Sequence, residues 1–292
     1  MIRTILLLLA MWGTPPTTDR RIQPEPEPAQ TYRIYTPIVL AESEIMPADD
    51  LRPIYGYASP HRRTYDVPFY NWNALARDCV NPHFWPMVRG QTVAADMVSV
   101  CDNGQRFLLI YNEPELTHYP ATPKQAAAFV HGWAVQWTGP IACCGNFYSD
   151  VGVTIPGAQW FVEFVESYQE LYGELPPLAA MHIHIYEYRG LNMDDLRAWR
   201  AIADTYKLRI IITESGTFPS ELYPPGDIAE RLPGFLAEVE SVLKPDVLMW
   251  FSDYLQPWIL GGDVAWHNLN LTEVDGTQTV VGKAWQEWIT RP

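Results

Sequence analysis

Residues 107–114 read FLLIYNEP and residues 209–216 read RIIITESG, and these two stretches decide the fold. Each is an apolar run typical of a strand buried on both faces, and each ends in a glutamate, Glu113 in the first and Glu214 in the second. A carboxylate at the end of a buried strand costs free energy unless it has a chemical task. The sequence therefore predicts that two carboxylates meet in one cleft.

Further apolar runs alternate with helix-like segments along the rest of the chain. We expect strands at 53–58, 67–72, 84–88, 107–112, 141–147, 179–186, 209–213 and 247–252, and the clearest helices at 123–137, 158–172, 193–206 and 227–243. Eight strands alternating with helices over about 240 residues predict an α/β protein with a (β/α)₈ TIM barrel. A doubly wound sheet is the main rival, but no glycine-rich phosphate loop follows the first strand, which argues against nucleotide binding.

The segments that precede the barrel have a different composition. Residues 1–20 begin with a basic, then apolar stretch that resembles a secretory signal, and residues 21–50 form a linker or tail rich in Pro and Glu. We expect a single catalytic domain at 51–292 and a secreted or extracytoplasmic protein, with surface attachment left open. The alternative for the first segment is a disordered apolar tail.

The net charge of −14 argues against nucleic acid and acidic polysaccharides as partners. The chain has 12 Trp and 16 Tyr, residue types that stack on sugar rings, so a neutral polysaccharide or oligosaccharide suits the composition. No apolar run is long enough to span a membrane. We expect a monomer that needs no cofactor.

Four cysteines are present. If the protein is secreted, one or two disulfides are expected, and four cysteines allow three connectivities. Cys79 with Cys101 is the preferred pair, because it closes a modest loop. The neighbours Cys143 and Cys144 lie in an apolar run and are expected as buried thiols rather than as metal ligands.

Polar residues gather where the expected strands end, and in a barrel these ends carry the active site. Glu113 and Glu214 follow two of these strands, while Glu115 and Glu187 are expected at the cleft mouth or in solvent. The other candidates are expected to bind substrate: Tyr70, Asn71, Trp72, Asn112, His184, Tyr186 and Trp250.

Several of these candidates have a competing interpretation. Trp250 is either the apolar floor under the cleaved sugar or a core residue, and Tyr70 and Trp72 share this ambiguity. His184 is expected to orient the nucleophile or a substrate hydroxyl, with His182 deeper and structural. A metal pair of these two histidines would need Asp253 or His267 as further ligands, and we expect no metal site.

Two carboxyl groups in one cleft are what glycoside hydrolysis needs. One carboxyl must donate a proton to the glycosidic oxygen while the other attacks the anomeric carbon, and a separation of about 5–5.5 Å between them gives retention of configuration. Asn112, beside Glu113, is placed to hydrogen-bond the sugar hydroxyl next to the reacting carbon. The rival from another functional class is a barrel that binds polysaccharide without cleaving it.

The strand motifs together resemble a known group of glycoside hydrolases. Their order is similar to that of clan A, and more narrowly to the Asl1-like catalytic core, or glycoside hydrolase family 128. The motifs that carry this resemblance are Tyr70-Asn71-Trp72, Phe84-Trp85-Pro86-Met87, Tyr111-Asn112-Glu113-Pro114-Glu115, His184-Ile185-Tyr186 and Thr213-Glu214-Ser215. The resemblance covers roughly residues 51–290, and Glu115 stands where the family pattern has Asp.

By that resemblance, Glu113 is the general acid/base and Glu214 is the nucleophile. The family implies a retaining endo-β-1,3-glucanase that uses no metal. The alternative within the same clan is another β-glycanase or β-glycosidase specificity, such as a mannanase-like or xylosidase-like activity.

Overall fold

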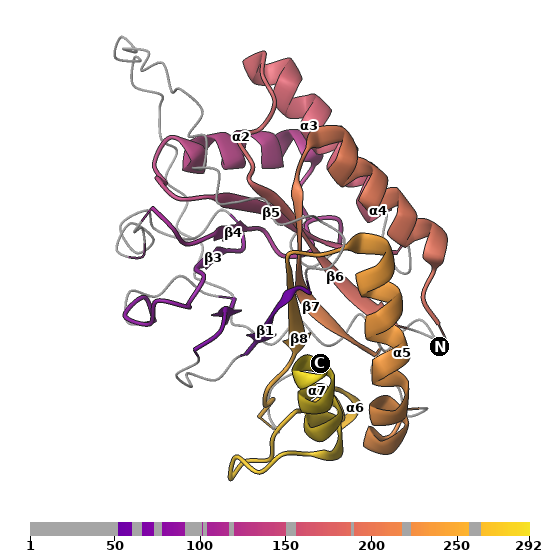
Figure 1. Ribbon diagram of the computed structural model, residues 1–292. Helices are drawn as coiled ribbons and strands as arrows, with labels where there is room; N and C mark the ends of the chain where they lie inside the picture. The colour runs from indigo at the N-terminus through magenta and orange to yellow at the C-terminus, as the bar shows by residue number, and fades with distance from the viewer. Residues whose placement is uncertain are drawn as a thin grey trace. The chain divides into compact units, whose positions relative to one another are not determined.

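A computed structural model describes residues 52–59, 66–72, 78–90, 101, 104–116, 120–149, 156–187, 190–217, 223–256 and 264–292 (Figure 1). They belong to one compact unit, Arg52–Pro292. The signal-like segment 1–20 and the linker 21–50 expected from the sequence lie outside the described residues.

Eight parallel strands form one sheet in the order β2-β1-β8-β7-β6-β5-β4-β3. They are β1 (Ile54–Ala58), β2 (Phe69–Tyr70), β3 (Met87–Val88), β4 (Leu108–Ile110), β5 (Ile141–Phe147), β6 (Ala180–Glu187), β7 (Arg209–Thr217) and β8 (Val247–Phe251). A parallel bridge between Phe69 and Phe84 joins β2 to the residues before β3. The Trp85 N–H donates to the Phe69 carbonyl at 2.8 Å. This bridge brings the two end strands together, which confirms the predicted (β/α)₈ barrel.

Helices alternate with the strands from β4 onward. They are α2 (Pro123–Ala134), α3 (Gly157–Tyr172), α4 (Met193–Tyr206), α5 (Pro225–Leu243), α6 (Val264–His267) and α7 (Val280–Thr290). Figure 1 shows α2, α3, α4 and α5 following one another along the outside of the sheet. Thr122 and Gln125 form a capping box at the start of α2, and the Asn192 side chain caps α4. The strands from β4 onward are therefore followed by helices that pack on the sheet, which explains their nearly continuous apolar sequences.

Most element bounds agree with the expectation within a few residues, and the differences have physical reasons. Helix α4 and strand β5 have the predicted bounds. Strand β7 continues four residues beyond the expected end at 213, because its pairing with β6 persists up to Thr217. Strands β2 and β3 are two residues long each. The longest strands, β6 and β7, thus carry regular structure into the end of the barrel where their polar residues lie.

Two disulfide bonds link the four cysteines. Cys79 is bonded to Cys101, the preferred pair. Cys143 and Cys144 are bonded to each other, so the expectation of free thiols was wrong, although both are fully buried as expected. Among the helices that the structure describes, none combines the length and the apolar character needed to cross a membrane.

Candidate active site

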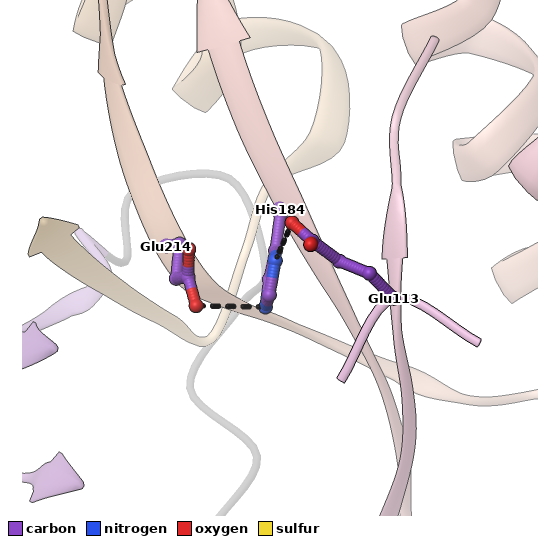
Figure 2. A group of neighbouring side chains, drawn as sticks. All are labelled: Glu113, His184 and Glu214. Carbon is purple, nitrogen blue, oxygen red and sulfur yellow. Dashed lines mark hydrogen bonds and ion pairs between the residues drawn. The ribbon is translucent and has the colours of Figure 1, made fainter. Parts of the chain in front are cut away.

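Glu113, His184 and Glu214 meet at the carboxyl ends of β4, β6 and β7. Figure 2 shows the imidazole of His184 between the two carboxylates. Its Nδ1 lies 2.9 Å from Oε1 of Glu113, and its Nε2 lies 3.4 Å from Oε1 of Glu214. Two glutamates far apart in the sequence thus share one histidine, as the strand-end rule for barrels predicts.

A β-bulge in β7 allows two successive side chains to face this site. The register between β6 and β7 shifts between Ile183 and His184, because Thr213 is an extra residue without a partner in the ladder. The Thr213 hydroxyl contacts Nδ1 of His182 at 3.1 Å, while Glu214 contacts His184. Strict alternation would send one of these two consecutive residues to the opposite face. The bulge therefore determines that both point inward.

Three side chains donate hydrogen bonds to the Glu214 carboxylate. Tyr70 and the Trp72 indole both donate to Oε1 at 2.8 Å, and Tyr186 donates to Oε2 at 2.6 Å. Hydrogen bonds to an ionised acceptor are about twice as strong as neutral ones. The carboxylate is therefore held in one orientation, and three of the predicted substrate-binding residues contact it directly.

The ionisation of the neighbouring groups suits this arrangement. Burial, reinforced by the charge of Glu214, raises the pKa of Tyr70 and of Tyr186 well above 10, so both phenols remain donors. Burial lowers the pKa of His184, but the charge of Glu214 and the contact with Glu113 outweigh it, so the pKa is raised overall. The imidazole is accordingly more readily protonated than in water.

The backbone around Glu113 adopts conformations that few non-glycine residues take. Tyr111 has φ 67°, Glu113 has φ 53°, and Trp72, which donates to Glu214, has φ 56°. Such residues cost on the order of 1–3 kcal/mol each and are often found at functional sites. The Glu113 N–H donates to the Gly145 carbonyl at 3.0 Å, which attaches this strained turn to β5.

Gly145 itself has no room for a side chain. It has φ 66°, and a Cβ there would lie 2.9 Å from Cε1 of His182 and 3.2 Å from the Asn112 Cα. Glycine is therefore required both by conformation and by space. Its backbone passes directly beneath the Glu113 turn.

His182 is structural, as expected. Its Nε2 lies 3.0 Å from the Ile110 carbonyl and its Nδ1 lies 3.1 Å from the Thr213 hydroxyl, which ties β4, β6 and β7 together. Burial and the neighbouring His184 lower the pKa of His182 to about 3, so it is neutral near pH 7. Because both ring nitrogens have partners, the alternative of a metal pair with His184 is not supported.

The two predicted asparagines lie in different surroundings. Asn112 is partly exposed beside Glu113, and its Oδ1 is buried without a hydrogen-bond partner among the described residues. Asn71 is buried, and its Nδ2 donates to the Asp78 carboxylate at 3.0 Å. Asn112 thus keeps a free acceptor beside the Glu113 carboxylate, whereas Asn71 helps to hold the loop after β2.

Of the two interpretations of Trp250, a floor under the sugar or a core residue, the structure supports the core residue, so its assignment to substrate binding was wrong. Its indole is fully buried, packs against Phe235 of α5 and Trp285 of α7, and donates to the Leu269 carbonyl at 2.9 Å. The next residue, Phe251, faces the opposite way, because successive strand side chains alternate. Trp250 is a core residue between the sheet and its helices.

Phe251 and Trp266, rather than Trp250, lie with Trp72 and Tyr186 beside Glu214. The Phe251 ring lies 5.6 Å from Trp72 and 6.0 Å from Tyr186 between centroids, and Trp266 lies 5.4 Å from Phe251 and 5.7 Å from Tyr186. Trp72 and Trp266 are partly exposed. These rings form an apolar surface beside Glu214, of the kind on which sugar rings stack.

Glu115 and Glu187 are buried, so their expected exposure was wrong. Both are 6% exposed. Glu187 pairs with Arg231 of α5. Glu115 accepts hydrogen bonds from the Asn146 side chain and the Phe147 N–H at the end of β5. In each case the partner lies far along the chain, so a local sequence pattern does not reveal the burial.

Glu113, His184 and Glu214 also form the one group of ligand-type atoms, among the described residues, close enough to share a metal ion. One atom from each lies within 4.8 Å of the others. The imidazole already bridges the two carboxylates (Figure 2). A metal ion bound about 2.0–2.2 Å from each ligand would have to displace the His184 imidazole from its place between the two carboxylates.

Comparison with known families agrees with this geometry. The family described as glycosyl hydrolase catalytic core matches residues 66–246, which is more than half of the chain. No curated protein matches the chain significantly.

Several solved structures share the fold. A subgroup II endo-β-1,3-glucanase of glycoside hydrolase family 128 from Pseudomonas viridiflava aligns with a TM-score of 0.62 at 17% identity, over 82% of this chain and 98% of its own. The subgroup I enzyme from Amycolatopsis mediterranei, in complex with laminaritriose, has a TM-score of 0.59 at 17% identity, over 81% and 100%. The subgroup IV enzyme from Lentinula edodes has a TM-score of 0.58 at 16% identity, over 79% and 98%. At these identities the likeness concerns the fold, and it agrees with the resemblance seen in the strand motifs.

Proposed function

The chain belongs to the glycosyl hydrolase catalytic-core family, and from this premise we propose that it cleaves β-1,3-glucan with retention of configuration. The observation that carries the proposal is the pairing of Glu113 and Glu214, with one oxygen of each within 4.8 Å of the other. Retaining glycosidases place their two carboxyl groups about 5–5.5 Å apart, whereas inverting enzymes leave roughly 6.5–9.5 Å for a water molecule.

The surroundings of the two glutamates support different roles for them. Glu214 is fixed by three donors, and within the part of the chain that the structure describes its Oε2 accepts one hydrogen bond, from the Tyr186 hydroxyl. That oxygen keeps a lone pair for attack on the anomeric carbon. The Glu113 carboxylate has His184 as its one hydrogen-bond partner among the described residues and is more exposed, as a group that exchanges protons with substrate and water requires.

The two carboxyls then act in two steps. In the first step, Glu113 protonates the glycosidic oxygen while Glu214 attacks the anomeric carbon, so that the bond to the leaving sugar breaks and a glycosyl ester forms. In the second step, Glu113 takes a proton from water, and the water oxygen displaces Glu214. His184 contacts both carboxylates, so its protonation state responds to the charge of each of them during the two steps.

The substrate class rests on composition, on the aromatic surface and on the fold neighbours. The net charge of −14 disfavours acidic polysaccharides. Trp72, Phe251 and Trp266 provide the apolar surface that a neutral sugar needs beside the nucleophile. The neighbours named above are endo-β-1,3-glucanases, and their TM-scores lie between 0.58 and 0.62. We therefore propose glucose polymers with β-1,3 linkages as substrate, bound by a monomer.

The test is product analysis on a panel of polysaccharides. Purified protein is incubated with β-1,3-, β-1,4- and mixed-linkage glucans, mannan and xylan, with Glu214→Gln as the control. We expect oligosaccharides from β-1,3-glucan alone, released as the β-anomer on NMR and absent in the control. Release of the α-anomer would contradict retention, and cleavage of another polymer would contradict the linkage. Binding without any products would instead identify a non-catalytic barrel.

The two disulfides also support an extracytoplasmic location, which we propose for the mature protein. Disulfides persist in oxidising compartments and are rare in the cytosol. Mass spectrometry of the protein recovered from its native source would test this, through the position of its first residue and the oxidation state of its cysteines.

A further inference from the structure

Glu115 is a buried acid that the proposed chemistry does not use. It lies two residues after Glu113 and is 6% exposed. Burial raises its pKa to about 7, even though hydrogen bonds from the backbone oppose that shift. A buried carboxyl without a cation partner is costly. Its position in the turn that carries Glu113 indicates what it contributes.

Both oxygens of Glu115 are attached to the end of β5. Oε2 accepts from the Asn146 side chain at 2.7 Å, and Oε1 accepts from the Phe147 N–H. The Glu113 N–H donates to the Gly145 carbonyl at 3.0 Å. Three successive residues of β5 are thus bonded to the turn, and two of the three bonds end on one carboxylate.

The same strand end leads to the nucleophile. The Phe147 ring stacks on Tyr186, with centroids 6.1 Å apart and planes 14° apart. Tyr186 in turn donates to Oε2 of Glu214 at 2.6 Å. The end of β5 therefore contacts both the Glu113 turn, through Glu115, and Tyr186, which is a hydrogen-bond donor to Glu214.

We propose that Glu115 is a positioning residue, whose carboxylate holds the turn bearing Glu113 at a fixed place relative to Glu214. This inference rests on the proposed function. Its physical basis is that both partners of Glu115, the Asn146 side chain and the Phe147 backbone, are N–H donors. Each of them donates to a separate oxygen of the carboxylate. The turn it holds is strained at Tyr111 and Glu113, so it would relax if the attachment were lost.

The experiment compares substrates that differ in their need for a proton. Glu115→Met removes both acceptor oxygens at similar side-chain volume. Glu115→Gln keeps one acceptor oxygen for the Phe147 N–H, and its amide N–H can donate to Oδ1 of Asn146 if the Asn146 amide is flipped. We measure kcat/KM on laminarin and on an aryl laminari-oligosaccharide with a dinitrophenolate leaving group, which departs without protonation. Glu187→Gln is the matched control, since Glu187 is equally buried but pairs with Arg231.

A displaced acid should slow only the reaction that needs it. We expect Glu115→Met to lower kcat/KM on laminarin by about 100-fold and on the aryl substrate by less than about 3-fold, with Glu115→Gln recovering to within about 10-fold of wild type. Glu187→Gln should change the ratio between the two substrates by less than about 2-fold. Should Glu115→Met fail to fold, Glu115→Gln carries the test through a smaller loss, of up to about 10-fold, that is again confined to laminarin.

Two results would overturn the inference. Equal losses on both substrates would show a merely structural role, and unchanged values in both variants would show no role. An inactive wild-type protein on both substrates would instead count against the proposed function itself, so the two failures are distinguishable.

Discussion

The two halves of the site hold their glutamates in different ways. On the side of β6 and β7, Glu214 has a side chain that is 7% exposed and accepts hydrogen bonds from three side chains. On the side of β4 and β5, Glu113 is 16% exposed, and its carboxylate has His184 as its one hydrogen-bond partner in the described chain. There the backbone is held instead, through Gly145 and Glu115.

The difference fits the double displacement that we propose, with Glu214 as nucleophile and Glu113 as acid/base. A nucleophile must present the same lone pair in every turnover, so direct hydrogen bonds to its oxygens are useful. An acid/base must gain and lose a proton in each turnover, and many donors to its carboxylate would favour one protonation state. Holding the turn rather than the carboxyl group fixes the position of Glu113 and leaves its proton free to move.

The largest effect is expected on the nucleophile side. Glu214→Gln keeps the shape of the side chain but removes the attacking oxygen anion, so turnover should fall by about 10⁴-fold or more on every substrate. Steady-state kinetics on laminarin and on the aryl substrate measure this, and binding of laminari-oligosaccharide should persist in calorimetry. Activity within about 10-fold of wild type would assign the nucleophile elsewhere.

The acid/base side should show a loss that depends on the leaving group. Glu113→Ala should lower kcat/KM on laminarin by about 10²–10⁴-fold, while the aryl substrate, which needs no protonation, keeps most of its kcat/KM. Azide should raise kcat on the aryl substrate, because an anion can replace the water that Glu113 no longer activates. Equal losses on both substrates without azide rescue would remove the contrast between the two halves.

A smaller loss is expected when one donor to the nucleophile is removed. Tyr186→Phe deletes the hydrogen bond to Oε2 of Glu214, and a bond to a charged group contributes about 1.5–3 kcal/mol, or about 10- to 150-fold in kcat. Tyr168→Phe is the matched control, as Tyr168 is a buried residue of α3 whose hydroxyl contacts His131 of α2. Similar kinetics for the two variants would show that the donors around Glu214 do not matter.

The remaining effect is on stability and its dependence on pH rather than on turnover. The raised pKa of Glu115, about 7 against an ordinary 4.5, means that the folded protein holds this proton more tightly than the unfolded chain. Its contribution to stability is present below pH 4.5 and lost as the pH rises through about 7, by about 3 kcal/mol at most. Glu115→Gln should therefore flatten the pH dependence of the unfolding free energy between pH 4.5 and 8, measured by urea titration. An unchanged slope would contradict the burial of a titrating acid here.

The strand-end rule accounts for what the sequence predicted well. Buried parallel strands read as apolar runs, and a glutamate that ends such a run stands out, so Glu113 and Glu214 could be paired without coordinates. His184 and Tyr186 share a face by simple alternation, and both contact the expected glutamates. These inferences depend only on spacing within one strand.

Other features depend on contacts that local spacing does not contain. Strand β8 is buried on both faces, so its apolar sequence does not show which of Trp250 and Phe251 faces the site. The bulge at Thr213 changes the alternation without a glycine to mark it. The burial of Glu115 depends on donors that come 31 and 32 residues later in the chain. Such features need the three-dimensional packing to be seen.

The crowded glycine under the Glu113 turn also limits how this site can evolve. Every amino acid that a single base change can introduce at position 145 adds a Cβ, which would meet the ring of His182, and would have to adopt φ 66° as well. New specificities reached by single steps should therefore arise in the loops that follow the strands, while position 145 stays glycine among functional descendants. A deep mutational scan selected for folding would show this as one of the least tolerant positions in the chain.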